Sequence, residues 1–183
     1  MWLTLRESPP SYIENWQLGA EGEQKTAKAL DGLERPRWFV VHDVACRRGN
    51  YDHIVVGPAG VFLLDSKNLQ GSVHVRDGKP YLHRRDDPEA NSACHWICTT
   101  TLAGAASLHD EIKRCTGHRA WVQAVVVLWS EFDDGVYQDE NCVLVHGSRI
   151  HEWLAGQPDK LDEKIVTELA AGVRSLASDA SHR

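Results

Sequence analysis

The sequence predicts one α/β domain in which helices flank a mixed central sheet. Its 183 residues are about the length of a single domain. Hydrophobic residues make up 42% of the chain and charged residues 25%, a mixture that is typical of globular proteins and excludes global disorder. Segments with helical periodicity alternate with short β-branched runs, and this order favours a sheet covered by helices.

Three long segments and one short segment have the spacing of amphipathic helices. Apolar residues recur every three or four positions in residues 20–33, 92–115 and 159–176. Gly32 and Pro36 are expected to end the first of these helices. A short helix that carries Ile150 and Leu154 is expected after Ser148, a residue type that often caps helices.

Short apolar and β-branched segments predict the strands. They are residues 38–41, 52–56, 61–67, 72–75, 80–83, 122–129 and 142–145. Turn residues separate 52–56 from 61–67, and Asp77-Gly78 separates 72–75 from 80–83, so both pairs are predicted to be β-hairpins. Segment 122–129 is almost continuously apolar, which is typical of a central strand buried on both faces.

Charge and cysteine content narrow the class of protein. Lys and Arg number 20 against 26 Asp and Glu, and the net charge of −6 argues against a broad basic surface. Five cysteines, an odd number, fit a reducing compartment better than a disulfide framework. Neither a signal peptide nor an apolar span is recognisable. We expect a cytoplasmic protein without membrane association, with residues 1–14 as an N-terminal arm and 15–183 as one domain.

The hairpin of residues 52–67 carries the charged residues of most interest. If residues 57–60 form its loop, Val56 faces Val61 and, four positions further along, Asp52 faces Asp65. Lys67 then lies on the same face as the two carboxylates. This register depends on the loop, because a shift by one residue would turn one carboxylate to the other face.

Two facing carboxylates require positive charge nearby. Opposed side chains on antiparallel strands lie roughly 5 Å apart, and like charges there repel each other. Lys67 supplies part of the compensation, and a divalent cation with oxygen ligands, Mg²⁺ or Mn²⁺, would supply the rest. The alternative is an ordinary Asp65–Lys67 ion pair at a strand end, with Asp52 unrelated to it.

These residues resemble those of the nuclease-related domain (NERD) family, a branch of the PD-(D/E)xK or restriction-endonuclease-like superfamily. Asp65 replaces the family's usual Glu, and Asn91 stands where the family often has Gln after an Asn-Pro pair. The stretches that carry the resemblance are 19–23, 51–56, 60–62, 65–71, 125–129 and 143–154. The resemblance implies the restriction-endonuclease-like form of the α/β fold.

The resemblance also implies roles for the site residues. Asp52 and Asp65 would hold the metal together with the backbone carbonyl of Ser66. Lys67 would stabilise charge on the phosphate or help to activate water, and Glu23 would complete the acidic cluster through a water on the metal. For Glu23 alone, a solvated helix position is the other interpretation.

Basic residues near the hairpin form a candidate groove for phosphates. The alternative is a solvated hairpin with no binding role. The candidates for nucleic-acid contact are Arg47, Arg48, Arg76, Lys79, Arg84 and Arg85. Asn91 is either an auxiliary site residue or the N-cap of the helix that follows.

The sequence thus favours a metal-dependent nuclease that hydrolyses phosphodiester bonds, with DNA as the expected substrate. The alternative is a non-catalytic module that keeps the fold and binds nucleic acid or protein within a larger DNA-processing or defence system. The residues Asp52, Asp65 and Lys67 favour the enzyme, because nothing structural requires all three.

Overall fold

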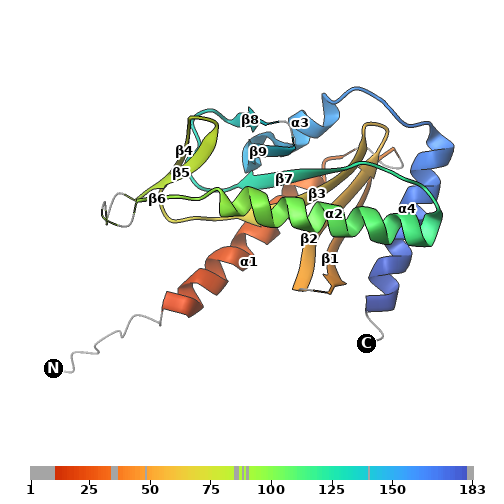
Figure 1. The fold of residues 1–183 in the computed structure, drawn as a ribbon, viewed down its shortest axis with the longest axis horizontal. Coiled ribbons are helices and arrows are strands. Elements are labelled where there is room, and N and C mark those ends of the chain that lie inside the picture. The colour runs from red at the N-terminus through yellow and green to blue at the C-terminus, as the bar shows by residue number, and fades with distance from the viewer. Residues whose placement is uncertain are drawn as a thin grey trace.

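A computed structural model describes residues 11–33, 37–47, 49–84, 87, 89, 91–139 and 141–180. Figure 1 shows their arrangement. In chain order the elements are α1 (Ser11–Leu30), β1 (Phe39–Cys46), β2 (Gly49–Gly57), β3 (Gly60–Lys67), β4 (Ser72–Arg76), β5 (Lys79–His83), β6 (Ser92–Ala93), α2 (Trp96–Thr116), β7 (Val122–Leu128), β8 (Val136–Gln138), β9 (Cys142–His146), the 3₁₀ turn η2 (Gly147–Arg149), α3 (Ile150–Ala155) and α4 (Glu163–Ala180).

The central sheet is mixed, as the sequence predicts. Its strand order is β1-β2-β3-β7-β9-β8. β3, β7 and β9 run parallel to one another, whereas β1, β2 and β8 join their neighbours in antiparallel pairs. β4, β5 and β6 form a second, small antiparallel sheet. The chain is therefore an α/β fold of the predicted class.

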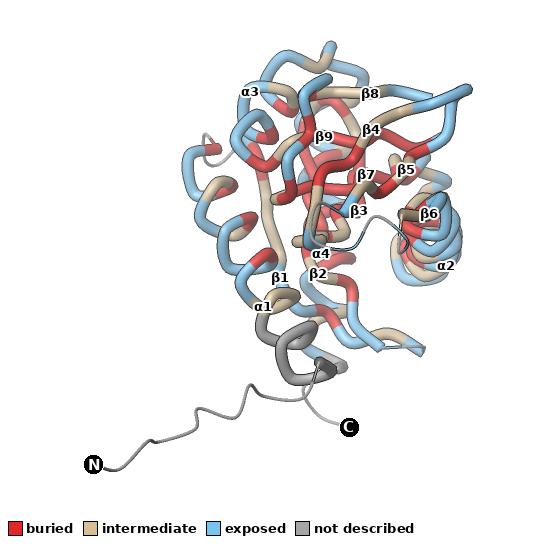
Figure 2. Tube along the Cα trace, turned by 90° about the vertical axis from the view of Figure 1, so that its left-hand side faces the viewer, coloured by how far each residue is buried: buried red, intermediate tan, exposed pale blue. Residues whose placement is uncertain are grey.

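Helices cover both faces of the central sheet. α2 and α4 contribute Ile97, Leu108 and Leu169 to one hydrophobic cluster, and α1 and α3 contribute Leu30 and Leu154 to another on the opposite face. Figure 2 shows α1 and α3 on one side of the sheet and α2 on the other, with the buried positions between them. The parallel strand β7 is buried over most of its length, as its apolar sequence predicts.

The helices occur where periodicity predicts them, but their ends differ. The first was predicted over residues 20–33 and extends from Ser11 to Leu30. α2 begins at Trp96 rather than at residue 92, because residues 92–93 pair with β5 as β6. α4 begins at Glu163 rather than at 159, where the Asp162 carboxylate accepts a hydrogen bond from the Ile165 amide, 2.8 Å away.

The predicted strands are present, although β1 extends to Cys46 rather than ending at residue 41, and the predicted register of the β2–β3 hairpin is confirmed as far as His53 and Leu64. Val56 faces Val61 and Ile54 faces Leu63, as the hairpin arithmetic requires. Gly57 and Gly60 also pair, so the turn between β2 and β3 consists of residues 58 and 59 alone. The short strands β6 and β8 were not predicted, because two or three residues carry no recognisable alternation.

The expected division of the chain at residue 14 falls within α1, and the single-domain assignment stays a prediction. Residues 1–10 lie outside the described part of the chain. Within the described part, none of the helices is both long enough and apolar enough to cross a membrane.

Candidate active site

The alternation of inward- and outward-facing side chains along β1 and β2 is interrupted, at Asp43 on β1 and at Asp52 on β2. Val41 and Val44 contact the same hydrophobic cluster although they are three residues apart, so strict alternation breaks between them. Asp43 lies at this break with a φ of 52°, a left-handed conformation that few non-glycine residues adopt. Tyr51 and Ile54 show the same break on β2, around Asp52. The register predicted from alternation therefore ends here.

Asp52 does not form the backbone pair with Asp65 that the sequence predicted. The β2–β3 pairing stops at His53 and Leu64. Beyond that point the Asp52 carboxylate takes the place of a backbone partner and accepts the Ser66 amide hydrogen at 2.8 Å. The side chain thus bridges two strands where they separate, and both carboxylates remain at the same end of the hairpin.

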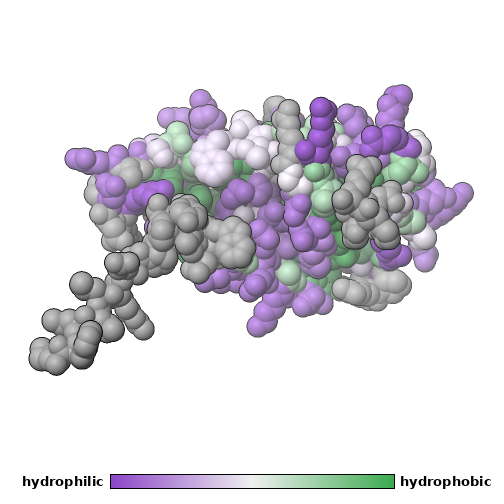
Figure 3. Space-filling model, turned by 90° about the horizontal axis from the view of Figure 1, so that it is seen from below, coloured by the Kyte–Doolittle hydropathy of each residue, from purple (hydrophilic) through white to green (hydrophobic). Residues whose placement is uncertain are grey.

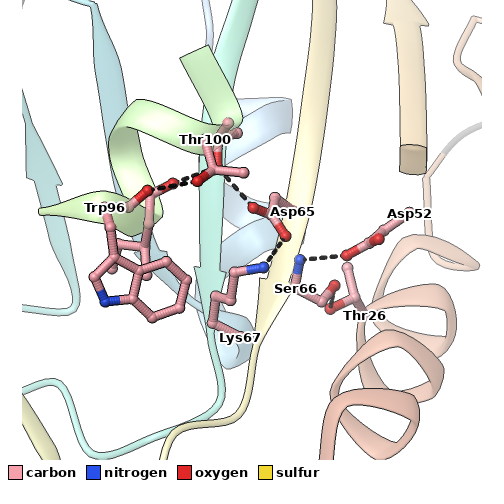
Figure 4. Close-up of polar contacts among 9 residues, drawn as sticks. Thr26, Asp52, Asp65, Ser66, Lys67, Trp96 and Thr100 are labelled. Carbon is pink, nitrogen blue, oxygen red and sulfur yellow. Dashed lines mark hydrogen bonds and ion pairs between the residues drawn. The ribbon is translucent and has the colours of Figure 1, made fainter. Parts of the chain in front are cut away.

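The Asp65 carboxylate is held from two directions. One oxygen accepts a hydrogen bond from the Lys67 ammonium, two residues further along β3. The other accepts a hydrogen bond of 2.8 Å from the hydroxyl of Thr101 on α2, a side chain that is fully buried. Figure 4 shows Asp65 between Lys67 and the α2 threonines, with Asp52 on the far side of Ser66.

Glu23 brings a third carboxylate to the group, from α1. Burial raises its pKa, and the charges of Asp43 and Asp65 raise it further, while Lys67 opposes them. The pKa of Asp52 rises from 3.8 to about 7, first because it is buried and then because Asp65 and Glu23 repel its charge. The Ser66 amide and Lys67 act against this rise. Negative charge is therefore only partly compensated here.

A buried hydroxyl joins three elements behind the carboxylates. Thr26 on α1 donates to the Gly22 carbonyl at 3.0 Å. It accepts one hydrogen bond from Ser66 and one from the indole N–H of Trp129, each 2.8 Å long. One donor and two acceptor positions are thereby all used. This network fixes α1, and with it Glu23, relative to β3 and the end of β7.

Small residues allow these elements to approach closely. A Cβ on Gly22 would lie 3.2 Å from the Cβ of Asn68, just beyond β3. A Cβ on Gly147 would lie 2.3 Å from the ring of Trp129, closer than real Cβ atoms come. Glycine at both positions lets the Trp129 ring lie between α1 and η2.

A cleft of about 490 Å³ opens in front of the carboxylates, between the sheet and α2. Gly104 lies in its wall, where a Cβ would come within 2.9 Å of Leu63. Tyr51 closes the far end, and its hydroxyl lies 3.4 Å from Glu111. The lining residues are Cys46, Arg47, Asn50, Tyr51, Asp52, Leu63, Leu64, Asp65, Lys67, Thr100, Thr101, Ala103, Gly104 and Ser107.

His53, next to Asp52, has a structural environment. It is buried, and its Nδ1 lies 2.7 Å from Nδ1 of His42 on β1. Burial lowers its pKa to about 4, with His42 adding to the effect, so the imidazole is neutral at pH 7. Its Nε2 is the one buried side-chain nitrogen or oxygen among the described residues that makes no hydrogen bond.

The structure separates the basic residues that the sequence grouped together. Arg47 lines the cleft, whereas Arg76 stacks on Tyr81 at 4.9 Å within the small sheet. Lys79 faces Arg76, and the adjoining turn residue Gly78 lies by Tyr137 of β8, at the far edge of the central sheet. Arg48 and Arg85 lie outside the described residues. The face seen in Figure 3 is mostly hydrophilic, with small hydrophobic patches.

Asn91 closes a loop rather than capping α2. Its side-chain oxygen accepts a hydrogen bond from the Arg84 amide at 2.6 Å. The N-cap position of α2 is His95, four residues later, so the capping interpretation of Asn91 is wrong. Asn91 is not among the cleft-lining residues, and an auxiliary role stays a prediction.

The donor set suits a hard divalent cation in its chemistry. Carboxylates are the preferred ligands of Mg²⁺ and Mn²⁺, and an added cation would relieve the repulsion that raises the pKa of Asp52. As they stand, the described His, Cys, Asp and Glu side chains form no group of three or more with the geometry to hold a metal. Asp65 would have to exchange its contact with Lys67 for the ion.

The profile of the nuclease-related domain (NERD) family matches residues 18–129, which include the greater part of α1, the β2–β3 hairpin, α2 and β7. The chain belongs to this family. NERD domains are part of the restriction-endonuclease-like superfamily, so the family predicted from the hairpin is confirmed. No curated protein and no solved structure gives a significant match to the chain.

Sequence reasoning missed several residues of this NERD domain's site. Thr26 and Thr101 carry no motif, because a hydroxyl in a helix is common and its partner lies far away in sequence. Trp129 was assigned to the core, yet its N–H serves the Thr26 network. Asp43 could have been noticed as an acid facing Asp52 once the register of β1 was known.

Proposed function

We propose that this NERD domain is a metal-dependent nuclease that hydrolyses phosphodiester bonds of nucleic acid, with DNA as the expected substrate. The observation that carries the proposal is the electrostatic state of the hairpin end. Asp52, Asp65 and Glu23 act on one another there, and Lys67 is the cation that the cleft places among them. A structural role would not require that Asp65 raise the pKa of both Asp52 and Glu23.

The chain's own residues divide the work. Asp52, Asp65 and the Ser66 carbonyl would hold Mg²⁺ or Mn²⁺, and Glu23 would complete the acidic environment from α1. The ion would supply positive charge for the phosphate oxygens and lower the pKa of water. Lys67, released from Asp65, would place its ammonium against the phosphate or help to activate the attacking water. Ser66 and Thr26 keep the two sides of the site in register.

The cleft provides room for the nucleic-acid backbone. Arg47 lies in its lining, so we assign it the phosphate contact nearest the site. Arg84 is exposed beyond β5, and Arg76 and Lys79 lie further away, where they would meet only a longer substrate. Arg48 and Arg85 remain sequence-based candidates for the same role. The cytoplasmic location likewise remains an expectation, which rests on the cysteine content.

The ion pair between Lys67 and Asp65 favours a second candidate function. An ammonium that neutralises its own strand's carboxylate would suit a domain that keeps the fold without catalysis and binds nucleic acid or protein. The two functions differ in what a divalent cation does. In the nuclease it displaces Lys67 from Asp65, whereas in the binding module the ion pair persists.

The decisive experiment measures cleavage of labelled single- and double-stranded DNA and RNA with Mg²⁺, with Mn²⁺ and with EDTA. We expect metal-dependent cleavage that falls at least a hundredfold in Lys67→Ala and Asp52→Ala. Lys164→Ala is the matched control, because this lysine is exposed on α4 and pairs only with Glu168 among the salt bridges found. Equal cleavage by wild type and Lys67→Ala would refute the proposal.

A further inference from the structure

Two large hydrophobic side chains are exposed in the described part of the chain, and they occupy very different places. Trp96, the first residue of α2, is 49% exposed, and Trp121, just before β7, is 66% exposed. Trp121 adjoins Val122, which faces Val61 at the start of β3. Lys67 lies six residues further along β3, roughly 20 Å away at the usual strand rise.

Trp96 begins the face of α2 that lines the cleft. Residues 96, 100, 103 and 107 follow one another at helical spacing, so they share one face of α2. Thr100, Ala103 and Ser107 line the cleft. The Trp96 carbonyl accepts the Thr100 hydroxyl at 2.8 Å, and the next residue, Thr101, donates to Asp65. The indole thus continues the cleft wall by one helical turn beyond the carboxylates.

The backbone that carries the indole is fixed. Ala93 pairs with Tyr81 in the small sheet, and the Cys94 amide donates to the Pro80 carbonyl at 3.0 Å. The Ile97 side chain, next to Trp96, is fully buried. In Figure 4 the Trp96 ring and the Lys67 side chain both extend to the same side of Asp65. The backbone at Trp96 is therefore fixed, and its exposed ring lies on the same side of Asp65 as Lys67.

We propose that Trp96 stacks on a nucleobase of single-stranded nucleic acid whose backbone lies in the cleft. The inference rests on the proposed nuclease function and specifies the substrate class of that site. An aromatic ring beside a cation suits one nucleotide, because the base stacks on the ring while its phosphate meets the ammonium. In a duplex the faces of each base are covered by its neighbours, so this contact requires an unpaired base.

The test compares binding of a labelled oligothymidylate 20-mer with binding of a 20-base-pair duplex, by fluorescence anisotropy with Ca²⁺ in place of Mg²⁺ and intact probe verified on a gel. Trp96→Ala should weaken single-strand binding about tenfold and change duplex binding less than twofold. Trp96→Phe should recover most of the affinity. Trp121→Ala is the matched control, a tryptophan that is even more exposed and lies at the other end of the sheet, and should bind like wild type.

A second measurement needs no variant. Replacing every thymidine by an abasic residue, which keeps the phosphates, should weaken binding about as much as Trp96→Ala does, roughly tenfold. Equal affinities for the two oligonucleotides, or single-strand affinity that is equal in Trp96→Ala and wild type, would overturn the proposal. An equal loss in Trp121→Ala would overturn it as well, because the effect would then not be local to the cleft.

The outcomes separate this inference from the function on which it rests. If the wild-type protein binds and cleaves no nucleic acid, the proposed function fails and the stacking role fails with it. If it cleaves as proposed but Trp96→Ala binds single strands normally, only the stacking role fails, and Trp96 becomes a candidate contact for a protein partner.

Discussion

The two sides of β3 at residues 65–67 are built from opposite chemistry. Ser66 points toward α1, where its hydroxyl, Thr26 and the Trp129 indole form a neutral network with every hydrogen-bonding position of the threonine in use. Asp65 and Lys67 point toward α2 and the cleft, where burial and mutual repulsion raise the pKa of Asp52 to about 7. One tripeptide thus separates a neutral, fully hydrogen-bonded network from a cluster of carboxylates whose charges repel one another.

The difference teaches which side is adapted to the fold and which to a ligand. Satisfied buried polar groups stabilise a unique arrangement of elements. Carboxylates that repel one another lower the stability of the folded protein, and a site retains them where a bound cation repays the cost. Substitutions on the two sides should therefore affect stability and activity in opposite senses.

The largest effect is expected for Asp52→Asn. Cleavage should fall at least a hundredfold, because a charged ligand is lost. Stability should rise at pH 8 without metal. The folded-state pKa of Asp52 lies above its unfolded value of 3.8, so ionising it between pH 4 and 7 destabilises the fold. The neutral amide escapes this cost, a gain on the order of 2 kcal/mol. Urea unfolding at pH 8 and pH 5 measures it.

At pH 5 the wild-type carboxyl is protonated in the folded protein but already ionised in the unfolded chain, so less than half of the gain from Asp52→Asn should remain, and the gain should vanish only below about pH 4. If Asp52→Asn is less stable than wild type at pH 8, the ionised Asp52 carboxylate does not destabilise the folded protein, and this explanation is wrong.

The second effect concerns proton and metal competition at the cleft. Because a proton must leave Asp52 before a cation binds, affinity for Mn²⁺ should fall by up to tenfold per pH unit below about pH 7. Titration calorimetry at pH 8, 7 and 6 gives the slope. In Asp52→Asn the binding that remains should lose this dependence on pH, and a slope that persists there would assign the proton to another group.

The third effect tests the satisfied side. Thr26→Val keeps the shape of the side chain and removes its hydroxyl, leaving the Ser66 hydroxyl and the Trp129 N–H without their partner. We expect a loss of about 2 kcal/mol in unfolding free energy, by urea denaturation. Thr26→Ser retains the hydroxyl and should lose much less. Equal stabilities of the valine and serine variants would show that the hydroxyl does not join the elements.

The smallest effect is expected for Thr101 on α2, which contacts Asp65. Thr101→Val removes the hydroxyl that orients Asp65, and affinity for Mn²⁺ should fall about tenfold with the fold intact. Thr99→Val is the control, because that hydroxyl is exposed and donates to the Trp96 carbonyl only. Calorimetry on both variants decides, and equal affinities would remove Thr101 from the site.

Much of this arrangement could be predicted from the sequence, because it depends on local patterns. Alternation and a short turn set the register of the β2–β3 hairpin, which brought Asp52, Asp65 and Lys67 to one end. The apolar run of β7 predicted a central strand. These features need only neighbours in the sequence or one turn.

The remaining features depend on contacts that no local pattern encodes. The faces of β1 and β2 reverse at Asp43, which has a positive φ angle, and at Asp52, and the β2–β3 pairing ends one residue before Asp65. The Thr26 network joins residues 40 and 103 positions apart. Periodicity also placed the start of α2 too early, because residues 92–93 are recruited by β5.

Gly104 has no Cβ, and this allows α2 to approach β3 closely. A Cβ at this position would lie only 2.9 Å from Leu63, so its absence lets α2 pack closely against β3 in the wall of the cleft. A single added methyl group would act as a wedge that widens the cleft without touching a charged residue. The side chain at residue 104 can therefore change the width of the cleft without changing the charged residues next to it.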